Sequence, residues 1–191
     1  PDYVRLLCRL GYEVDCSVTP TVSWRRHKGS PAGSGGIDYT GFPDVAYFMD
    51  LDDPRNVGAG PLLQLPMTVG FRYPAPAFLR RSPIANLPAL RSWLGSRDWF
   101  RPKNGNLPEM RRLLERARAT GSPYIEFMLH SSEFMPGGSP TFPDADSVEN
   151  LYALLEQIFE SMSRDYSGYT LAEYHAGVQA GQFPALRLQQ A

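Results

Sequence analysis

Residues 124–141 read YIEFMLHSSEFMPGGSPT. The apolar run 124–129 is bounded by turn-forming residues, which is typical of a short buried strand. A histidine, two serines and a glutamate, residues 130–133, follow it directly and lead into a Pro-Gly-Gly loop. Because α/β folds place their catalytic groups at the carboxyl ends of strands, His130 is the first candidate for chemistry. A histidine packed in the core is the alternative.

The rest of the chain predicts an alternation of helices and strands. Apolar spacing and capping residues predict helices at 2–10, 88–94, 108–119, 147–163 and 171–180, and strands at 14–18 and 61–69. This alternation predicts an α/β fold, and 191 residues suit a single domain spanning 1–191. Since a strand should precede the first helix, we expect the chain to begin in mid-fold.

Residues 19–60 contain no convincing regular element and predict a long loop. Its aromatic residues, among them Trp24 and Tyr39, favour an ordered cover over a free linker. Its aspartates lack the central glycine and the terminal glutamate of an EF-hand loop. We therefore interpret them as turn and cap residues.

Composition excludes some classes of protein. A formal net charge of −1 argues against a nucleic-acid partner, because nucleic-acid readers usually carry a basic face. The sequence has no apolar run of about 18 residues, so we expect no membrane span and a cytoplasmic location. An aromatic content of 12% suits a carbohydrate or peptide cleft, and ordinary packing equally well. Cys8 and Cys16 lack metal-ligand spacing and are interpreted as buried apolar groups.

Two segments carry a family resemblance. Residues 10–24, LGYEVDCSVTP…W, and residues 127–141, FMLHSSEFMPGGSPT, are similar to the last two motifs of the polysaccharide deacetylase family (NodB homology, carbohydrate esterase family 4). Residues 60–68, GPLLQLPMT, resemble the strand between those motifs. The resemblance covers residues 11–164. It extends in particular to deacetylase-like proteins encoded in bacterial O-antigen or capsule clusters, which act in lipopolysaccharide and capsule biosynthesis.

The resemblance implies the C-terminal part of a distorted (β/α) barrel that removes acetyl groups from N-acetylated amino sugars with a divalent metal, usually zinc. His130 matches the family's general acid, and Asp15 matches the aspartate that holds and charges this histidine. A neighbouring carboxylate favours the protonated form of a histidine. Trp24 matches the aromatic wall of the acetyl pocket, and Leu129 would add apolar wall. Glu133 is interpreted as a polar contact to sugar or as a simple loop carboxylate.

The sequence also departs from the family. The acidic pair, the paired histidines and the arginine that complete the family's metal site and base lie upstream in the family order and are absent here. We therefore expect no metal ligands in this chain, and we expect that these 191 residues alone do not hydrolyse an acetamide.

Two interpretations stay open. The chain is the C-terminal part of a metal-dependent sugar deacetylase, or it is a non-catalytic saccharide-binding or scaffold protein of the same fold. A serine hydrolase is disfavoured, because adjacent strand residues such as His130 and Ser131 point to opposite faces and the sequence has no G-x-S-x-G elbow. Exposed strand edges of an incomplete barrel would favour a homo-oligomer.

Overall fold

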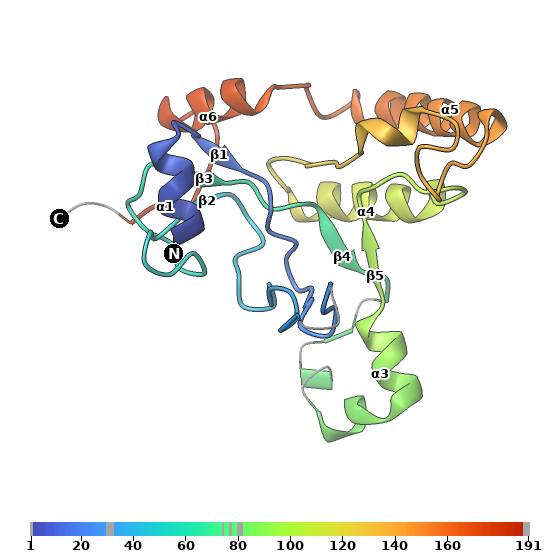
Figure 1. The fold of residues 1–191 in the computed structure, drawn as a ribbon, viewed down its shortest axis with the longest axis horizontal. Coiled ribbons are helices and arrows are strands. Elements are labelled where there is room, and N and C mark those ends of the chain that lie inside the picture. Colours follow the sequence, from blue (N-terminus) through green and yellow to red (C-terminus); the bar gives the residue numbers. More distant parts are fainter. Residues whose placement is uncertain (1, 30–32, 74, 77, 80–81, 189–191) are drawn as a thin grey trace. The chain divides into compact units, whose positions relative to one another are not determined.

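The computed structural model describes residues 2–29, 33–73, 75–76, 78–79 and 82–188. Its contacts divide the chain into two compact units: unit 1 comprises residues 1–68 and 166–191, and unit 2 comprises residues 69–165. Both units combine helices with a small sheet, so the fold is mixed α/β (Figure 1). The strands of the described residues do not close into a barrel. The deacetylase-type barrel and the single domain both stay predictions.

A three-stranded sheet forms the centre of unit 1. Its strands follow the order β1 (Val14–Asp15), β3 (Leu63–Gln64), β2 (Tyr47–Phe48). Strand β1 is parallel to β3, whereas β2 is antiparallel to it. Asp15, Gln64 and Tyr47 lie opposite one another in register. Because side chains alternate between the faces of a sheet, these three residues share one face.

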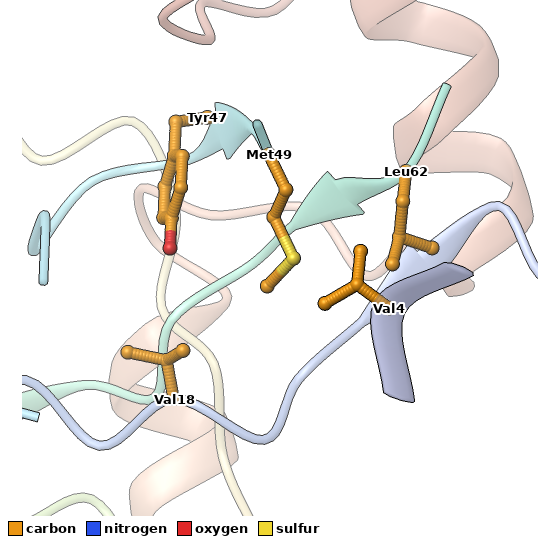
Figure 2. Close-up of a cluster of buried hydrophobic side chains, with 5 residues drawn as sticks. All are labelled: Val4, Val18, Tyr47, Met49 and Leu62. Carbon is orange, nitrogen blue, oxygen red and sulfur yellow. The ribbon is translucent and has the colours of Figure 1, made fainter. Parts of the chain in front are cut away.

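The two helices of unit 1 cover opposite faces of this sheet (Figure 1). Helix α1 (Asp2–Arg9) packs Val4 against four residues on the face of Tyr47. Figure 2 shows these five side chains, Val4, Val18, Tyr47, Met49 and Leu62. Helix α6 (Leu171–Gln179) reaches the other face, where the ring of His175 lies 6.4 Å from the ring of Phe48.

Unit 1 corrects two of the sequence predictions. The strands predicted over 14–18 and 61–69 shrink to β1 and β3, each of two residues. The predicted loop 19–60 contains β2, so it is not without regular structure. A two-residue strand leaves no alternating pattern in the sequence, because its position is set by the strand it pairs with.

Gly58 lies close to the backbone of residues 48–50, which form and follow the end of β2. Its N–H donates to the carbonyl of Phe48 at 2.8 Å. A Cβ at Gly58 would lie 2.6 Å from the main-chain nitrogen of Asp50. Because backbone atoms must move to relieve this overlap, we expect Gly58→Ala to lower the free energy of unfolding by about 2 kcal/mol. Urea denaturation measures the change. Gly41→Ala, which adds a Cβ with no atom within 4 Å, is the matched control, and equal stability of the two variants would contradict the prediction.

Unit 2 is built on an antiparallel pair and two long helices. Its elements are β4 (Val69–Phe71), η1 (Pro83–Asn86), α3 (Pro88–Gly95), β5 (Arg97–Trp99), α4 (Leu107–Thr120), η2 (Ser131–Phe134) and α5 (Ala145–Met162). Strands β4 and β5 pair with each other, and Arg116 of α4 donates to the carbonyl of Phe71 at 3.0 Å. Among the described residues, the helices fall short of the length and apolar character that a bilayer crossing requires.

The predicted buried strand 124–129 is wrong. These residues belong to no strand, and each is only partly buried. Phe127 and Leu129 pack instead against a cluster that α5 and the preceding loop supply: Phe142, Val148, Leu151 and Leu155. The apolar character of the segment therefore serves packing against a helix rather than pairing in a sheet. A short apolar run does not distinguish these two environments in the sequence.

Candidate functional site

His130 immediately precedes the short helix η2 and exposes its side chain to solvent. Its main-chain N–H donates to Oε2 of Glu133 at 2.9 Å. In return, the N–H of Glu133 donates to the carbonyl of His130 at 2.9 Å. These two hydrogen bonds fix the backbone of His130 while leaving its imidazole accessible, an arrangement that suits a proton donor.

Glu133 is buried, with 1% of its surface exposed. Its second oxygen accepts a hydrogen bond from Nη2 of Arg101 at 2.9 Å. Burial alone would raise the pKa of Glu133, but the His130 N–H and the Arg101 guanidinium outweigh it and lower the pKa below its ordinary value. Glu133 is thus an ionised, buried carboxylate that holds His130. Its contact to sugar stays a prediction.

Arg101 lies in the connection between β5 and α4 and was not a candidate in the sequence. Its carbonyl accepts from Nδ2 of Asn106 at 2.9 Å, which orders this connection. The sequence does contain a signal for the role of Glu133. A glutamate three residues after a helix N-cap commonly accepts a hydrogen bond from the backbone N–H of the cap residue. That signal predicts the hydrogen bond from the His130 N–H to Glu133. It does not identify Arg101, the cationic partner of Glu133, which lies 32 positions away in the sequence.

Glu126 is a second acidic group near His130 in the sequence that was not a predicted site residue, because it lies inside the apolar run 124–129. Its Oε2 atom is buried, and burial raises the pKa of Glu126 to about 7. A carboxyl group with this pKa exchanges its proton near neutral pH, which is a common property of functional sites. A charged residue within an otherwise apolar run is the signal that could have identified it.

Asp15 is 8% exposed and belongs to unit 1. Its Oδ1 accepts from the hydroxyl of Tyr3 and from the main-chain N–H of Ser17, both at 3.2 Å. Its Oδ2 accepts from the hydroxyl of Ser17 at 2.7 Å. His130 belongs to unit 2, and its pairing with Asp15 stays a prediction.

The two predicted wall residues have defined surroundings within their own units. Trp24 is partly buried, and its Nε1 donates to Oγ1 of Thr19 at 3.3 Å. The ring of His27 meets the Trp24 ring edge-on at 5.1 Å. Leu129 packs into the apolar cluster beneath α5. The role of either residue in an acetyl pocket stays a prediction.

The donor groups of the described residues do not fit the zinc site that the resemblance implies. No group of three or more histidine, cysteine, aspartate or glutamate side chains is placed to hold a metal in the described part of the chain. The carboxylate of Asp15 is bonded to Tyr3 and Ser17, and that of Glu133 is bonded to Arg101 and the His130 backbone.

No family model, no curated protein and no solved structure matches this chain. The resemblance to polysaccharide deacetylases therefore rests on the two sequence motifs.

Proposed function

We propose that this chain supplies the proton-donating part of a metal-dependent deacetylase that acts on N-acetylated amino sugars in surface-polysaccharide biosynthesis. The observation that carries the proposal is the exposed imidazole of His130 on a backbone held by buried Glu133. A general acid must be accessible to substrate and fixed in position, and His130 combines both properties.

The chemistry assigned to His130 is the second half of amide hydrolysis. Water attacks the acetyl carbonyl carbon and forms the new C–O bond. The C–N bond then breaks as the nitrogen takes a proton from the protonated imidazole, which yields acetate and a free amino sugar. Asp15 would stabilise the imidazolium form of His130. We assign no metal ligand to the described residues.

A non-catalytic saccharide-binding protein is the second candidate. It is favoured by Trp24, which is only partly buried, and by the hydrogen bonds that Tyr3 and Ser17 already make to Asp15. Aromatic rings offer an apolar face to a ligand while their polar edge bonds to the protein. In this alternative, Asp15 and His130 would contact sugar hydroxyl groups without transferring a proton.

The test uses the protein as its gene encodes it, with N-acetylglucosamine oligomers as substrate and zinc present. We expect His130→Ala to lower acetate release at least 100-fold, as is typical for the loss of a general acid, while the bound metal content is unchanged. Ser132→Ala, at an exposed neighbouring position, should retain activity. Normal turnover by His130→Ala would refute the assignment of the acid.

A binding measurement separates the two candidates. Acetate release by the encoded protein identifies an enzyme. Saturable binding of the oligomers without release, measured by saturation-transfer NMR, identifies the binding protein, and the absence of both rejects the two candidates together. Release of acetate by the 191-residue chain alone would overturn our expectation that the metal ligands lie elsewhere.

A further inference from the structure

The chain leaves the β4–β5 pair between its two strands and forms there what we call the η1–α3 lobe, the described residues of 73–96. At the base of the lobe, the N–H of Arg72 donates to the carbonyl of Ser96 at 2.9 Å. Nε of Arg72 also donates to Oδ1 of Asp98 at 2.8 Å. Figure 1 shows α3 beyond the ends of β4 and β5, away from α4 and α5. The lobe is therefore anchored at its base and projects from the two strands.

The described residues of the lobe expose five large apolar side chains: Tyr73, Phe78, Ile84, Leu87 and Trp93. Phe78, at 75%, is the most exposed large apolar residue in the described part of the chain. Trp93 is 44% exposed even though its ring stacks on that of Tyr73 at 4.7 Å. Large apolar side chains that gather on one exposed part of a protein mark a surface that contacts a partner.

The same region is positively charged, in a chain whose formal net charge is −1. From residue 69 to residue 97 the sequence contains five arginines and no lysine, aspartate or glutamate. The first carboxylate after this stretch, that of Asp98, pairs with Arg72 at the base of the lobe. Arg97 donates to the carbonyl of Gly95 at 2.8 Å. This excess of arginine favours an anionic partner.

The apolar exposure and the charge together select the kind of partner. A nucleic acid would neutralise the arginines, but its phosphates would leave Phe78, Ile84 and Leu87 without an apolar contact. The surface of an anionic membrane satisfies both groups. Its headgroups attract arginine, and the boundary between headgroups and acyl chains accepts phenylalanine and leucine. Tryptophan and tyrosine are enriched at that same boundary.

We propose that the η1–α3 lobe binds the surface of an anionic lipid membrane. Phe78 and Leu87 enter the boundary between headgroups and acyl chains, Trp93 lies at its edge, and the arginines of 69–97 attract the lipid phosphates. The contact is peripheral, because α3 has only eight residues and is far too short to cross a bilayer. The lobe shares no residue with the proposed deacetylase site.

Co-sedimentation of the unmodified chain with lipid vesicles tests the membrane contact. We expect phosphatidylcholine vesicles that contain about 30% phosphatidylglycerol to bind the chain at least roughly 10-fold more tightly than pure phosphatidylcholine vesicles. Raising the salt to about 0.5 M NaCl should weaken this binding by a similar factor, because salt screens the arginines. Equal binding to the two kinds of vesicle, or binding to neither, would overturn the proposal.

A pair of double variants assigns the contact to the lobe. Phe78→Ser with Leu87→Ser should weaken binding to the anionic vesicles by roughly 10-fold or more, because two apolar side chains no longer leave water. Leu87 is the N-cap of α3, where serine is favoured, so this change retains the helix. Leu10→Ser with Leu188→Ser removes two exposed apolar side chains of unit 1 and should leave binding unchanged. An equal loss in the two double variants would contradict the assignment.

Fluorescence quenching by brominated phosphatidylglycerol locates the contact without these double variants. The chain has three tryptophans, of which Trp93 belongs to the lobe. Vesicles of the brominated lipid should quench the fluorescence of the unmodified chain. Trp93→Phe should lose most of this quenching, and Trp24→Phe should keep it. Quenching that persists in Trp93→Phe, or tighter binding to duplex DNA than to the anionic vesicles at the same salt concentration, would overturn the proposal.

Discussion

Replacement of Arg101 by methionine is expected to lower the free energy of unfolding by about 3 kcal/mol at pH 7. Methionine keeps an unbranched apolar side chain but removes the guanidinium that donates to Glu133 at 2.9 Å. The Glu133 carboxylate, 1% exposed, would then be buried without its cation. Removing one partner of a buried ion pair typically costs 3–5 kcal/mol for this reason. Because the side chain of Arg101 is 24% exposed, we expect a value at the lower end.

The pH dependence of this effect follows from the lowered pKa of Glu133. A carboxyl group with a depressed pKa in the folded state contributes stability that is present above its ordinary pKa of 4.5. This contribution is lost as the pH falls through the folded-state pKa. The difference between the unmodified chain and Arg101→Met should therefore shrink in acid, as urea denaturation at pH 7 and pH 3 would show.

Arg111→Met is the matched control, because Arg111 is exposed on α4 and bonds to Gln157 at 3.3 Å. We expect it to change the free energy of unfolding by less than about 0.5 kcal/mol. A cost for Arg101→Met that equals that of Arg111→Met, or that persists unchanged at pH 3, would contradict a buried ion pair.

Glu126→Gln is expected to remove a loss of stability that the unmodified chain shows between pH 5 and pH 8. Burial raises the pKa of Glu126 from its ordinary value of 4.5 to about 7. With a raised pKa, the folded state holds the proton more tightly, so folding is weakened as the pH rises from the unfolded to the folded pKa. The penalty reaches about 3 kcal/mol above pH 7. Glutamine cannot ionise and should remove most of it.

Urea denaturation at pH 5, 7 and 8.5 measures this effect, and carbon NMR of the Glu126 carboxyl group reports its titration directly. Glu156→Gln is the control, because Glu156 is exposed on α5. It should follow the pH profile of the unmodified chain. Parallel profiles for Glu126→Gln and Glu156→Gln, or a titration of Glu126 near pH 4.5, would overturn the prediction.

The helices could be predicted because their signals are local. The predicted helix 108–119 is confirmed as α4, which ends at Gly121 with φ of 64°, and a residue with positive φ is usually glycine. Helix α6 begins after Thr170, as predicted, and the Thr170 hydroxyl accepts from the N–H of Glu173 at 3.2 Å.

The start of α5, at Ala145, was predicted two residues too late. Its cap is Asp144, whose Oδ1 accepts from the N–H of Ser147 at 2.8 Å. The predicted helix began at Ser147. The hydroxyl oxygen of Ser147 instead accepts from the N–H of Asp144 at 3.1 Å. Several acidic and hydroxyl residues follow one another here, and the sequence does not indicate which of them bonds to the helix end.

The strands and the surroundings of the site could not be predicted in the same way. Strand β2 is set by its pairing with β3, and residues 124–129 pack against α5 instead of joining a sheet. Both outcomes depend on partners distant in the sequence, whose pairing no local pattern encodes. The same reason kept Arg101 out of the predicted site.

The amino-acid sequence alone determined the helices and the candidacy of His130. It determined them because periodicity, capping residues and the residues that follow an apolar run are properties of neighbouring positions. Only the tertiary structure decided that Glu133 is buried on Arg101 and that Glu126 has a raised pKa. Burial and pairing over long sequence separations set the energy of these groups, and both exist only once the chain is folded.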